Sequence, residues 1–282
     1  MSDQRPDAGW FVGVDPGDPA AAAAAIYGNT AESPQDWPAE AVRSGFADDG
    51  ADYYETLHAA TLAATREAVA ERERSDDQQL KHAVRAMDDA ERTANELAER
   101  LVEWAGAFDR DVPAGTDGAR EVVAWEPSTP AEERVVSLGQ RVLDLDEERA
   151  ELRSFVESHA PEVVPNLAAM AGPVLAARLI SLAGGLEPLA KKPAGTVQVL
   201  GAEDALFAHL RGRGSSPKHG VIFTHEYVRG THPENRGSAA RAFAGKLAIA
   251  ARIDHYAGEY KQSVHDDLAD RMATIREREV NR

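Results

Sequence analysis

The stretch Gly172-Pro-Val-Leu-Ala-Ala-Arg-Leu-Ile-Ser-Leu-Ala-Gly-Gly185 is the part of this chain around which the rest is organised. Its leucines recur every three or four residues, which is the spacing of one helical face, and the closing glycine pair is typical of a helix C-terminus. A second stretch, Gly201-Ala-Glu-Asp-Ala-Leu-Phe207, predicts another short helix that continues to Leu210. We therefore expect residues 161–282 to be entirely helical.

Further segments complete this carboxy-terminal region. Prolines and a glycine interrupt residues 186–200, which we expect to form an irregular connector. Residues 211–217 read as a basic loop that leads into Pro217-Lys-His-Gly-Val-Ile-Phe-Thr-His225. Beyond it, the spacing of apolar residues predicts one closing helix from about Ser238 towards Glu279.

Upstream, two heptad patterns predict an antiparallel helical hairpin, one through residues 80–108 and one through residues 135–156. Thr129 and Glu132 have the spacing of a capping box at the start of the second helix. Residues 109–128 show no helical period, so they are expected to turn the chain around. The core positions of the first helix are Leu80, Met87, Ala94, Leu101 and Phe108, with Ala83, Ala90, Leu97 and Trp104 at the second position.

The amino-terminal residues predict a small α/β domain. Trp10-Phe-Val-Gly-Val14 is a short apolar run that favours a strand, and Asp15-Pro-Gly-Asp18 has the composition of a turn. A helical pattern then runs from Asp52 to Arg74. The predicted fold class is therefore mainly α, with three domains at residues 1–75, 76–160 and 161–282.

Composition constrains the compartment. The chain has no cysteine, which excludes disulfides and thiolate zinc sites and favours a reducing compartment. The longest apolar run near the start, residues 20–27, is far shorter than the roughly 20 residues that span a bilayer. We expect a soluble, cytoplasmic protein with no membrane partner.

Charge is divided unevenly along the chain. The formal net charge of −17 argues against a nucleic-acid ligand. However, residues 1–150 hold 33 acidic and 14 basic residues, whereas residues 161–262 hold 8 acidic and 12 basic residues. The chain also has 6 lysines against 25 arginines, which favours a halophilic archaeal source. In about 1 M salt the Debye length is roughly 3 Å, so distant acidic surface would scarcely repel RNA. An ordinary acidic protein that never meets RNA is the alternative.

No catalytic, cofactor or metal site is predicted. Residues 237–246 resemble a phosphate-binding loop only superficially, because Ala240 replaces its second glycine and Leu247 replaces its magnesium-binding hydroxyl residue. Acidic residues 144–148 fall at solvent-facing heptad positions. Three loop histidines are spaced six and seven residues apart, which does not favour a compact metal site. These are His219, His225 and His232.

Taken in order, the segments of residues 166–255 resemble the Nop domain, the RNA- and protein-binding module of box C/D ribonucleoprotein scaffolds. The resemblance extends to Arg236-Gly-Ser-Ala-Ala-Arg-Ala-Phe-Ala-Gly-Lys-Leu-Ala-Ile-Ala-Ala-Arg-Ile-Asp254. The hairpin, especially residues 86–104, is similar to the coiled-coil arm through which archaeal members form homodimers. Family members usually place a longer insertion between the arm helices than residues 109–128, so the resemblance leaves self-association open.

The resemblance implies an RNA-binding surface on the carboxy-terminal domain. Family members place the segment matching Gly201-Ala-Glu-Asp204 against RNA, and a histidine matching His225 lies against a base in a related splicing scaffold. Stacking on an accessible base is typical of RNA recognition. The sequence departs from the family at Asp204 and Ser238, which replace lysines. The candidate RNA-binding residues are Gly201, Ala202, Glu203, Asp204, Lys218, His219, His225, Arg236, Arg241 and Lys246.

The spacing of basic residues leaves two interpretations open. Lys218 and His219 lie beside Gly220, so the loop can approach a phosphate. Arg241 and Arg252 return to nearly the same side of an ideal helix and predict a basic stripe. The alternative is that these residues only make an apolar helix soluble.

The implied function is that of a scaffold in a box C/D guide-RNA particle that directs 2′-O-methylation of ribosomal or transfer RNA. The resemblance implies three partners: the guide RNA, the methyltransferase fibrillarin on the amino-terminal domain, and a small ribosomal-type protein bound to the kink-turn RNA. The scaffold itself is not expected to be an enzyme. The alternatives are a splicing-type Nop-domain scaffold and a coiled-coil adaptor that binds no RNA.

Overall fold

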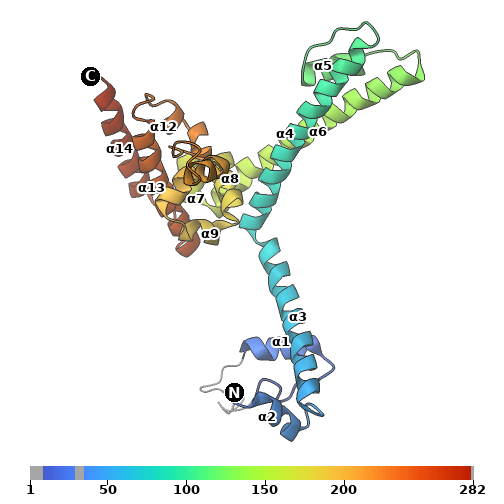
Figure 1. Cartoon of the computed structure of the whole chain (residues 1–282), viewed down its shortest axis with the longest axis vertical. Helices are drawn as coiled ribbons and strands as arrows, with labels where there is room; N and C mark the ends of the chain where they lie inside the picture. Colours follow the sequence, from blue (N-terminus) through green and yellow to red (C-terminus); the bar gives the residue numbers. More distant parts are fainter. Residues whose placement is uncertain (1–8, 29–34, 281–282) are drawn as a thin grey trace. The chain divides into compact units, whose positions relative to one another are not determined.

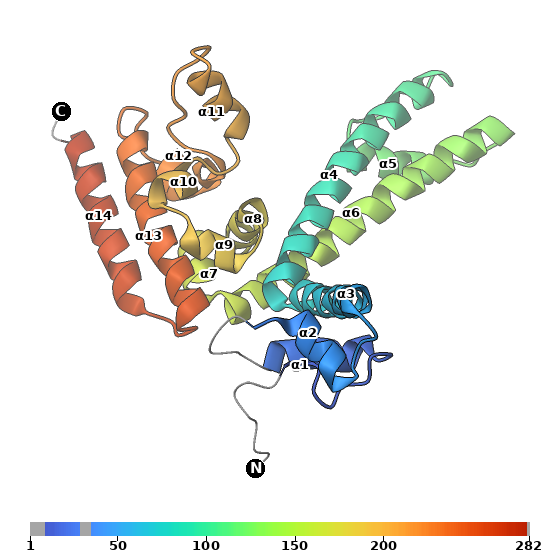
Figure 2. The same cartoon turned by 60° about the horizontal axis from the view of Figure 1, so that its bottom comes forward.

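The computed structural model describes residues 9–28 and 35–280, and within these ranges it contains helices and no strands. The prediction of a mainly α fold is therefore confirmed. The chain divides into two compact units, Met1–Ser75 and Asp76–Arg282. Figures 1 and 2 show the helices of each unit.

The first unit consists of three helices and an aromatic cluster. The helices are α1 (Pro19–Gly28), α2 (Trp37–Ser44) and α3 (Gly50–Arg74). Phe11 lies at the centre of the cluster, with its ring centroid 5.4 Å from that of Phe46 and 6.2 Å from that of Tyr53. These three side chains are buried, so the cluster forms the small core of the unit.

The predicted strand at residues 10–14 is wrong. The Val12 N–H donates to the Gly9 carbonyl at 3.1 Å, and the Val14 N–H donates to the Phe11 carbonyl at 3.1 Å, so the segment folds into turns. The described residues offer no neighbouring strand for pairing. The aromatic side chains that resembled a strand instead pack against α3, as the hydrogen bond from Trp10 Nε1 to the Tyr53 hydroxyl shows.

The arm of the second unit is the expected antiparallel hairpin of α4 (Asp76–Gly106) and α6 (Pro130–Val163) (Figure 1). Leu80 and Leu101 are fully buried along its seam. Thr129 and Glu132 form the predicted capping box at the start of α6. Trp104 departs from the heptad prediction, because its side chain is 39% exposed.

The link between the arm helices contains a helix that the sequence did not predict. This helix, α5 (Thr116–Val123), packs against α6 and buries Ala119 and Val122 completely. The approach is close, because a Cβ added at Gly139 would lie 3.3 Å from the Ala119 carbonyl oxygen. The expectation of a helix-free turn was wrong because α5 is short and Gly115, at its N-cap, provides no side-chain cap.

The remaining helices form a body around α13, and their core continues into the base of the arm. Leu80 of α4 and Val156 of α6 belong to the same buried cluster as Phe243 and Leu247 of α13. The arm and the body therefore share one core. The elements of the body are α7 (Pro165–Ala171), α8 (Pro173–Ala183), α9 (Leu186–Lys191), α10 (Ala194–Val199), α11 (Glu203–Leu210), the 3₁₀ helix η1 (Val221–Thr224), α12 (Glu226–Arg229), α13 (Arg236–Tyr256) and α14 (Gln262–Val280).

Two expectations for the body need correction. The connector at residues 186–200 contains α9 and α10, whose six-residue length is too short for a periodic signal. The single closing helix is in fact α13 and α14, because the N–H groups of Ala257 and Gly258 both donate to the Ile253 carbonyl and end α13. Gly258 takes a left-handed φ of 71° at this break. Helix α14 then packs back against α13 and buries Leu268 and Met272.

A buried polar cluster joins α7, α13 and the start of α14. Asp254 Oδ1 accepts hydrogen bonds from the Asn166 backbone N–H at 3.0 Å and from Asn166 Nδ2 at 2.7 Å, and Asp254 Oδ2 accepts one from the Leu167 N–H at 2.9 Å. The Lys261 N–H donates to Asn166 Oδ1 at 2.8 Å. Burial raises the pKa of Asp254, although these donors oppose the rise. The cluster fixes the corner between α13 and α14.

None of the described helices is, by itself, long and apolar enough to cross a membrane. Only when α7 and α8 are taken together are they long and apolar enough, and the chain bends by 117° at the break between these two helices.

Candidate nucleic-acid interface

Three hydrogen bonds hold the loop of residues 216–220 and the first residue of η1 against α10 and its C-cap residue Leu200. Gln198 Nε2 donates to the Lys218 carbonyl at 2.7 Å, the Gly220 N–H donates to the Gln198 carbonyl at 2.8 Å, and the Val221 N–H donates to the Leu200 carbonyl at 2.7 Å. A Cβ at Gly220 would lie 1.9 Å from the Leu200 carbonyl oxygen, so this position requires glycine. The loop backbone is therefore fixed at Lys218 and Gly220, on either side of His219.

His219 takes part in a stack with Phe223 and Arg236. The His219 and Phe223 ring centroids are 4.5 Å apart with an interplanar angle of 16°, and the Arg236 guanidinium carbon lies 5.4 Å from the Phe223 centroid. Arg236 is oriented by hydrogen bonds to the carbonyls of Thr231 at 3.0 Å and Arg229 at 3.2 Å. Burial, with the positive charges of Arg236 and Lys218, lowers the pKa of His219 and favours a neutral imidazole. We call His219, Phe223 and Arg236 the His219 stack.

His225 is built into the body. Its Nδ1 accepts a hydrogen bond from the Tyr227 N–H at 3.1 Å and caps α12. Its ring stacks on Phe243, with centroids 4.5 Å apart, and Phe243 is fully buried. Burial lowers the pKa of His225. One ring face of each histidine therefore contacts a phenylalanine, and one ring nitrogen of His225 is engaged as well.

The structure divides the predicted basic residues into two groups. Lys218 and Arg241 are exposed and line the same cavity of about 510 Å³. Lys246 instead forms an ion pair with Asp267 of α14 at 2.8 Å, and Arg252 donates to the carbonyls of Ala190 at 3.1 Å and Lys192 at 3.2 Å. The basic stripe predicted along α13 is thus tied to neighbouring elements except at Arg241.

The segment Gly201, Ala202, Glu203 and Asp204 forms the entrance to α11. Gly201 has a left-handed φ of 79°, and its N–H donates to Glu203 Oε1 at 2.8 Å. Glu203 and Asp204 are exposed in the first turn of α11. Because they are acidic, these two side chains are poor candidates for direct phosphate contacts, although backbone donors of the segment remain near the surface.

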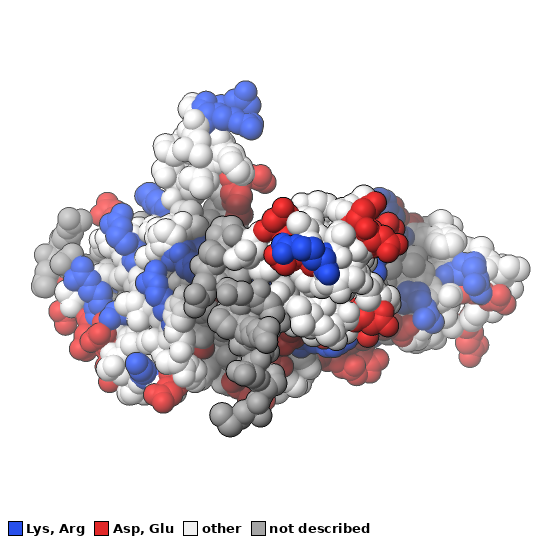
Figure 3. Space-filling model, turned by 90° about the horizontal axis from the view of Figure 1, so that it is seen from below, with Lys and Arg blue, Asp and Glu red and all other residues white. Residues whose placement is uncertain are grey.

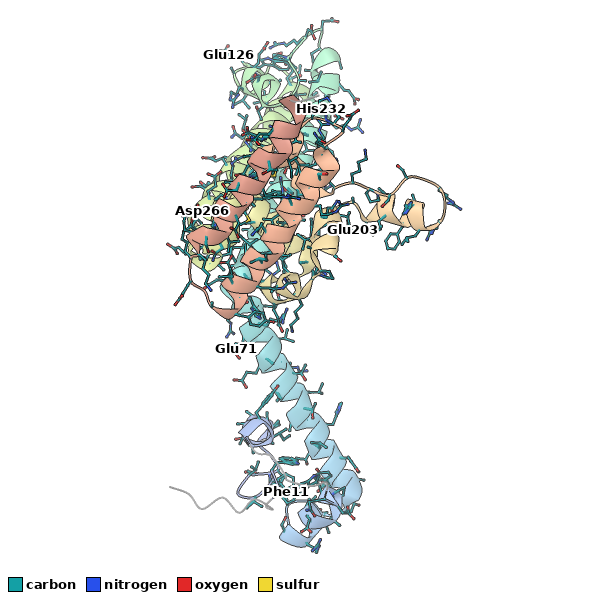
Figure 4. All side chains as sticks on the ribbon, turned by 90° about the vertical axis from the view of Figure 1, so that its left-hand side faces the viewer. Phe11, Glu71, Glu126, Glu203, His232 and Asp266 are labelled. Atoms are coloured by element: carbon teal, nitrogen blue, oxygen red, sulfur yellow. The ribbon has the colours of Figure 1, made fainter. Side chains whose placement is uncertain are left out.

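Helix α11 presents an apolar surface that the candidate residues did not include. None of its residues is buried, and Phe207 and Leu210 are 56% and 71% exposed. Figures 2 and 4 show α11 standing away from the other helices of the body. The exposed Arg211 and Arg213 follow in the next loop, and basic side chains occupy the end of the projecting segment in Figure 3. Sequence reasoning missed Phe207 and Leu210 because an amphipathic pattern usually indicates a buried face.

A second hollow, of about 940 Å³, lies between α4, α8 and η1. Its arginines already have partners. Arg85 donates to Ser181 Oγ at 2.9 Å, and Arg178 forms an ion pair with Asp88. This hollow therefore offers fewer uncommitted charges than the cavity beside Lys218. In the part of the chain that the structure describes, no three histidine or carboxylate side chains gather as a metal site.

Comparison with known proteins places this surface in a family context. Residues 121–274, more than half of the chain, match the model of the family named Nop and described as "snoRNA binding domain, fibrillarin". The chain is 49% identical over 138 residues to an uncharacterised NOP5 family protein of Methanocaldococcus jannaschii, a match that covers 49% of this chain and 32% of that protein.

Eukaryotic proteins and a solved structure are also similar. The chain is 38% identical over 149 residues to nucleolar protein 56 of Schizosaccharomyces pombe, which covers 52% of this chain and 30% of that protein. The match spans about a third of the length of these curated relatives. A solved structure entitled as a fibrillarin/Nop5p complex is 25% identical, covers 90% of this chain and 92% of the matched chain, and has a TM-score of 0.54.

Proposed function

This chain belongs to the Nop family, whose model describes a snoRNA-binding domain, and on that premise we propose that it is the scaffold of a box C/D guide-RNA particle. In this proposal the particle directs 2′-O-methylation of ribosomal or transfer RNA. The chain binds RNA and proteins but transfers no methyl group itself. Residues 1–75 form the amino-terminal domain, residues 76–160 the arm and residues 161–282 the RNA-binding domain.

The loop of residues 216–220 is the observation that carries this proposal. It presents a half-buried, stacked imidazole next to Lys218, on a support fixed by hydrogen bonds to α10, and Lys218 shares a cavity with the exposed Arg241 of α13. An aromatic surface next to basic residues is the usual combination for an unpaired base and its phosphates. The loop also lies within the residues that match the family model.

Within this surface we assign base stacking to His219 in preference to His225. Both rings stack on a phenylalanine, His219 on Phe223 and His225 on Phe243, but the ring of His225 is also engaged through Nδ1, which accepts a hydrogen bond from the Tyr227 N–H. The segment 201–204 then contacts the RNA through its backbone N–H groups; it consists of Gly201, Ala202, Glu203 and Asp204. Lys218 and Arg241 contact the RNA through their positive charges. We assign Arg236 to orienting Phe223, and Lys246 to the ion pair with Asp267.

The partners belong to the same proposal. The solved relative is a complex of fibrillarin and Nop5p, which supports fibrillarin as the methyltransferase partner of this chain. A small ribosomal-type protein bound to the kink-turn RNA completes the recognition surface. The partly exposed Trp104 on α4 supports self-association through the arm as part of the same proposal.

Reconstitution tests this function. We expect methyl transfer to a target RNA only when this chain, fibrillarin, the kink-turn-binding protein and guide RNA are all present. Methyl transfer by the chain alone, or full transfer in its absence, would contradict the proposal. Two results together would favour the coiled-coil adaptor. The chain would not bind a kink-turn RNA that carries its protein partner, and the chain purified in high salt would be free of nucleic acid.

A further inference from the structure

The hollow of about 940 Å³ between α4, α8 and η1 has an apolar floor. Apolar side chains from all three elements line it, and one of them, Leu182 of α8, is 44% exposed. The floor consists of Val84, Leu182, Val221 and Phe223. We call this space the arm–body hollow. An exposed leucine in a concave apolar site is typical of a surface that another apolar segment covers.

Helix α11 carries an apolar face of its own beside the arm–body hollow. Phe207 and Leu210, which are 56% and 71% exposed, are three residues apart and therefore lie on one side of the helix. The hollow extends to the base of α11, because Gly201 and Glu203 also line it. Two exposed apolar surfaces of one chain thus adjoin, and contact between them would remove both from water.

The attachment of α11 permits it to move. In the described ranges, the hydrogen bonds of residues 203–210 all stay within residues 201–214. The N-cap residue is Ala202, whose side chain has no acceptor for a capping hydrogen bond. Gly201 before the helix and Gly212 after it have left-handed φ angles of 79° and 70°. Because glycine adopts either sign of φ at little cost, the chain can turn at both ends of α11 while the helix stays folded.

Charge complementarity favours α11 over RNA as the occupant of the hollow. Arg85 of α4 lines it, and among the described residues no carboxylate lies within ion-pairing distance of this guanidinium. The first turn of α11 carries Glu203 and Asp204, so closure brings carboxylates towards Arg85. Asp88 and Asp89 also border the hollow, and their charges would repel the phosphates of an RNA strand.

We propose that α11 is a hinged cover, which in the RNA-free chain rotates about Gly201 and lays Phe207 and Leu210 on the floor of the arm–body hollow. The arrangement in Figure 2, in which α11 stands away from the body, is then the open one of two states. RNA that contacts residues 201–204 holds α11 open, a second step that rests on the proposed function. Closure therefore competes with RNA binding, because a ligand that binds only the open state shifts the population towards it.

The full chain has no cysteine, so two introduced cysteines can carry spin labels at chosen positions. Ala205→Cys places one label on α11, two residues before Phe207 and therefore on the other side of the helix. Asp89→Cys places the second at the edge of the hollow on α4. Pulsed electron paramagnetic resonance should give a shorter and a longer distance in the RNA-free chain. The shorter one should disappear with a kink-turn RNA bound by its ribosomal-type protein, and should remain with that protein alone.

Substitutions on either side of the contact should reduce the population with the shorter distance. Phe207→Ser and Leu182→Ser should each lower the closed-to-open ratio roughly 5- to 10-fold, because each removes apolar area that closure buries. The double variant should lose less than the two single effects combined. Tyr256→Ser is the matched control, because Tyr256 is 68% exposed on α13 outside the hollow, and it should leave both populations unchanged. Circular dichroism melting establishes that each variant is folded.

A single longer distance in the RNA-free chain would overturn the inference, as would a shorter distance that Phe207→Ser and Leu182→Ser both retain. A shorter distance that persists in the RNA-bound chain would refute the competition with RNA. Its loss on addition of the ribosomal-type protein alone would assign the hollow to that protein instead. Absence of RNA binding by the wild-type chain would refute the proposed function, whereas a shorter distance that the two substitutions remove would still establish closure.

Discussion

Asp254→Asn is the substitution whose effect the structure defines most closely. The carboxylate accepts three N–H groups, two from Asn166 and one from Leu167. Asparagine keeps one acceptor oxygen and turns an NH₂ group towards the remaining donors, so at least one buried N–H loses its partner. An unsatisfied buried donor costs about 1–3 kcal/mol, and the remaining bonds lose their charge assistance.

The neutral side chain offsets part of this loss. Burial raises the pKa of Asp254, which means that the buried charge itself is unfavourable. We therefore expect a net loss of about 2–3 kcal/mol in the free energy of unfolding. For a unit of this size, that corresponds to a fall in Tm of roughly 4–12 °C.

Thermal unfolding followed by circular dichroism measures this effect, with Asp270→Asn as the control because Asp270 is exposed on α14. The control should change stability by less than about 0.5 kcal/mol. Asn166→Ala should also destabilise the protein, and the double variant should lose less than the sum of the single losses because both side chains belong to one cluster. Equal Tm values for Asp254→Asn and wild type would refute the assignment of this cluster as the corner between α13 and α14.

Other predictions concern the arm, pH and salt. Leu101→Asp places an unpaired charge in the fully buried seam of the arm and should cost several kcal/mol in urea unfolding, roughly 3 or more; unchanged helicity and unfolding would contradict the seam. Because burial lowers the pKa of His225, the native state binds fewer protons than the unfolded chain just below the ordinary histidine pKa, so stability should fall as pH drops through this interval. His225→Asn, which retains a capping oxygen, should reduce that pH dependence, and an identical dependence in the variant would contradict it. Since the net charge is −17, Tm should rise from 0.1 M to 2 M KCl as repulsion is screened, and a higher Tm in low salt would argue against a halophilic source.

The sequence predicted the arm well because its signals are local and repeated. Leu80 and Leu101 recur at heptad spacing and are buried, and Thr129 with Glu132 forms the predicted capping box. Helix α5 was missed because only Ala119 and Val122 mark its buried face, and two residues do not establish a period. Periodicity therefore identified the long amphipathic helices and failed for the short helices α5, α9 and α10.

The amino-terminal unit and the end of the chain show why some predictions failed. The apolar residues near Trp10 resembled a strand, yet the described residues provide no strand for pairing, and an aromatic cluster takes them up instead. The apolar pattern of α13 continues into α14, so it could not reveal the reversal at Gly258. Pattern alone records which residues are buried, and not whether the helix that carries them is continuous.

The same limitation applies to the candidate site. Lys246 was predicted to contact RNA from its position on α13, but its ion-pair partner Asp267 lies on α14, which sequence spacing placed further along the same helix. Conversely, Lys218 and Arg241 are 23 residues apart, and only the fold brings them to one cavity. The sequence supplied candidate residue types for the proposed site, whereas the division between cations that have an acidic partner and cations that have none among the described residues required the structure.

The net charge of the chain makes the difference between paired and unpaired cations important for the proposed RNA binding. In about 1 M salt, screening over roughly 3 Å removes long-range attraction as well as long-range repulsion, so a dispersed basic surface would contribute little to RNA binding. Cations that converge on one cavity, beside hydroxyl donors and an aromatic stack, act at contact distance and lose less of their effect. The chain has only 6 lysines, and one of them, Lys218, borders the cavity next to His219 of the His219 stack. Under the proposed function, a chain with so acidic an amino-terminal half would hold RNA through a small surface on its carboxy-terminal domain.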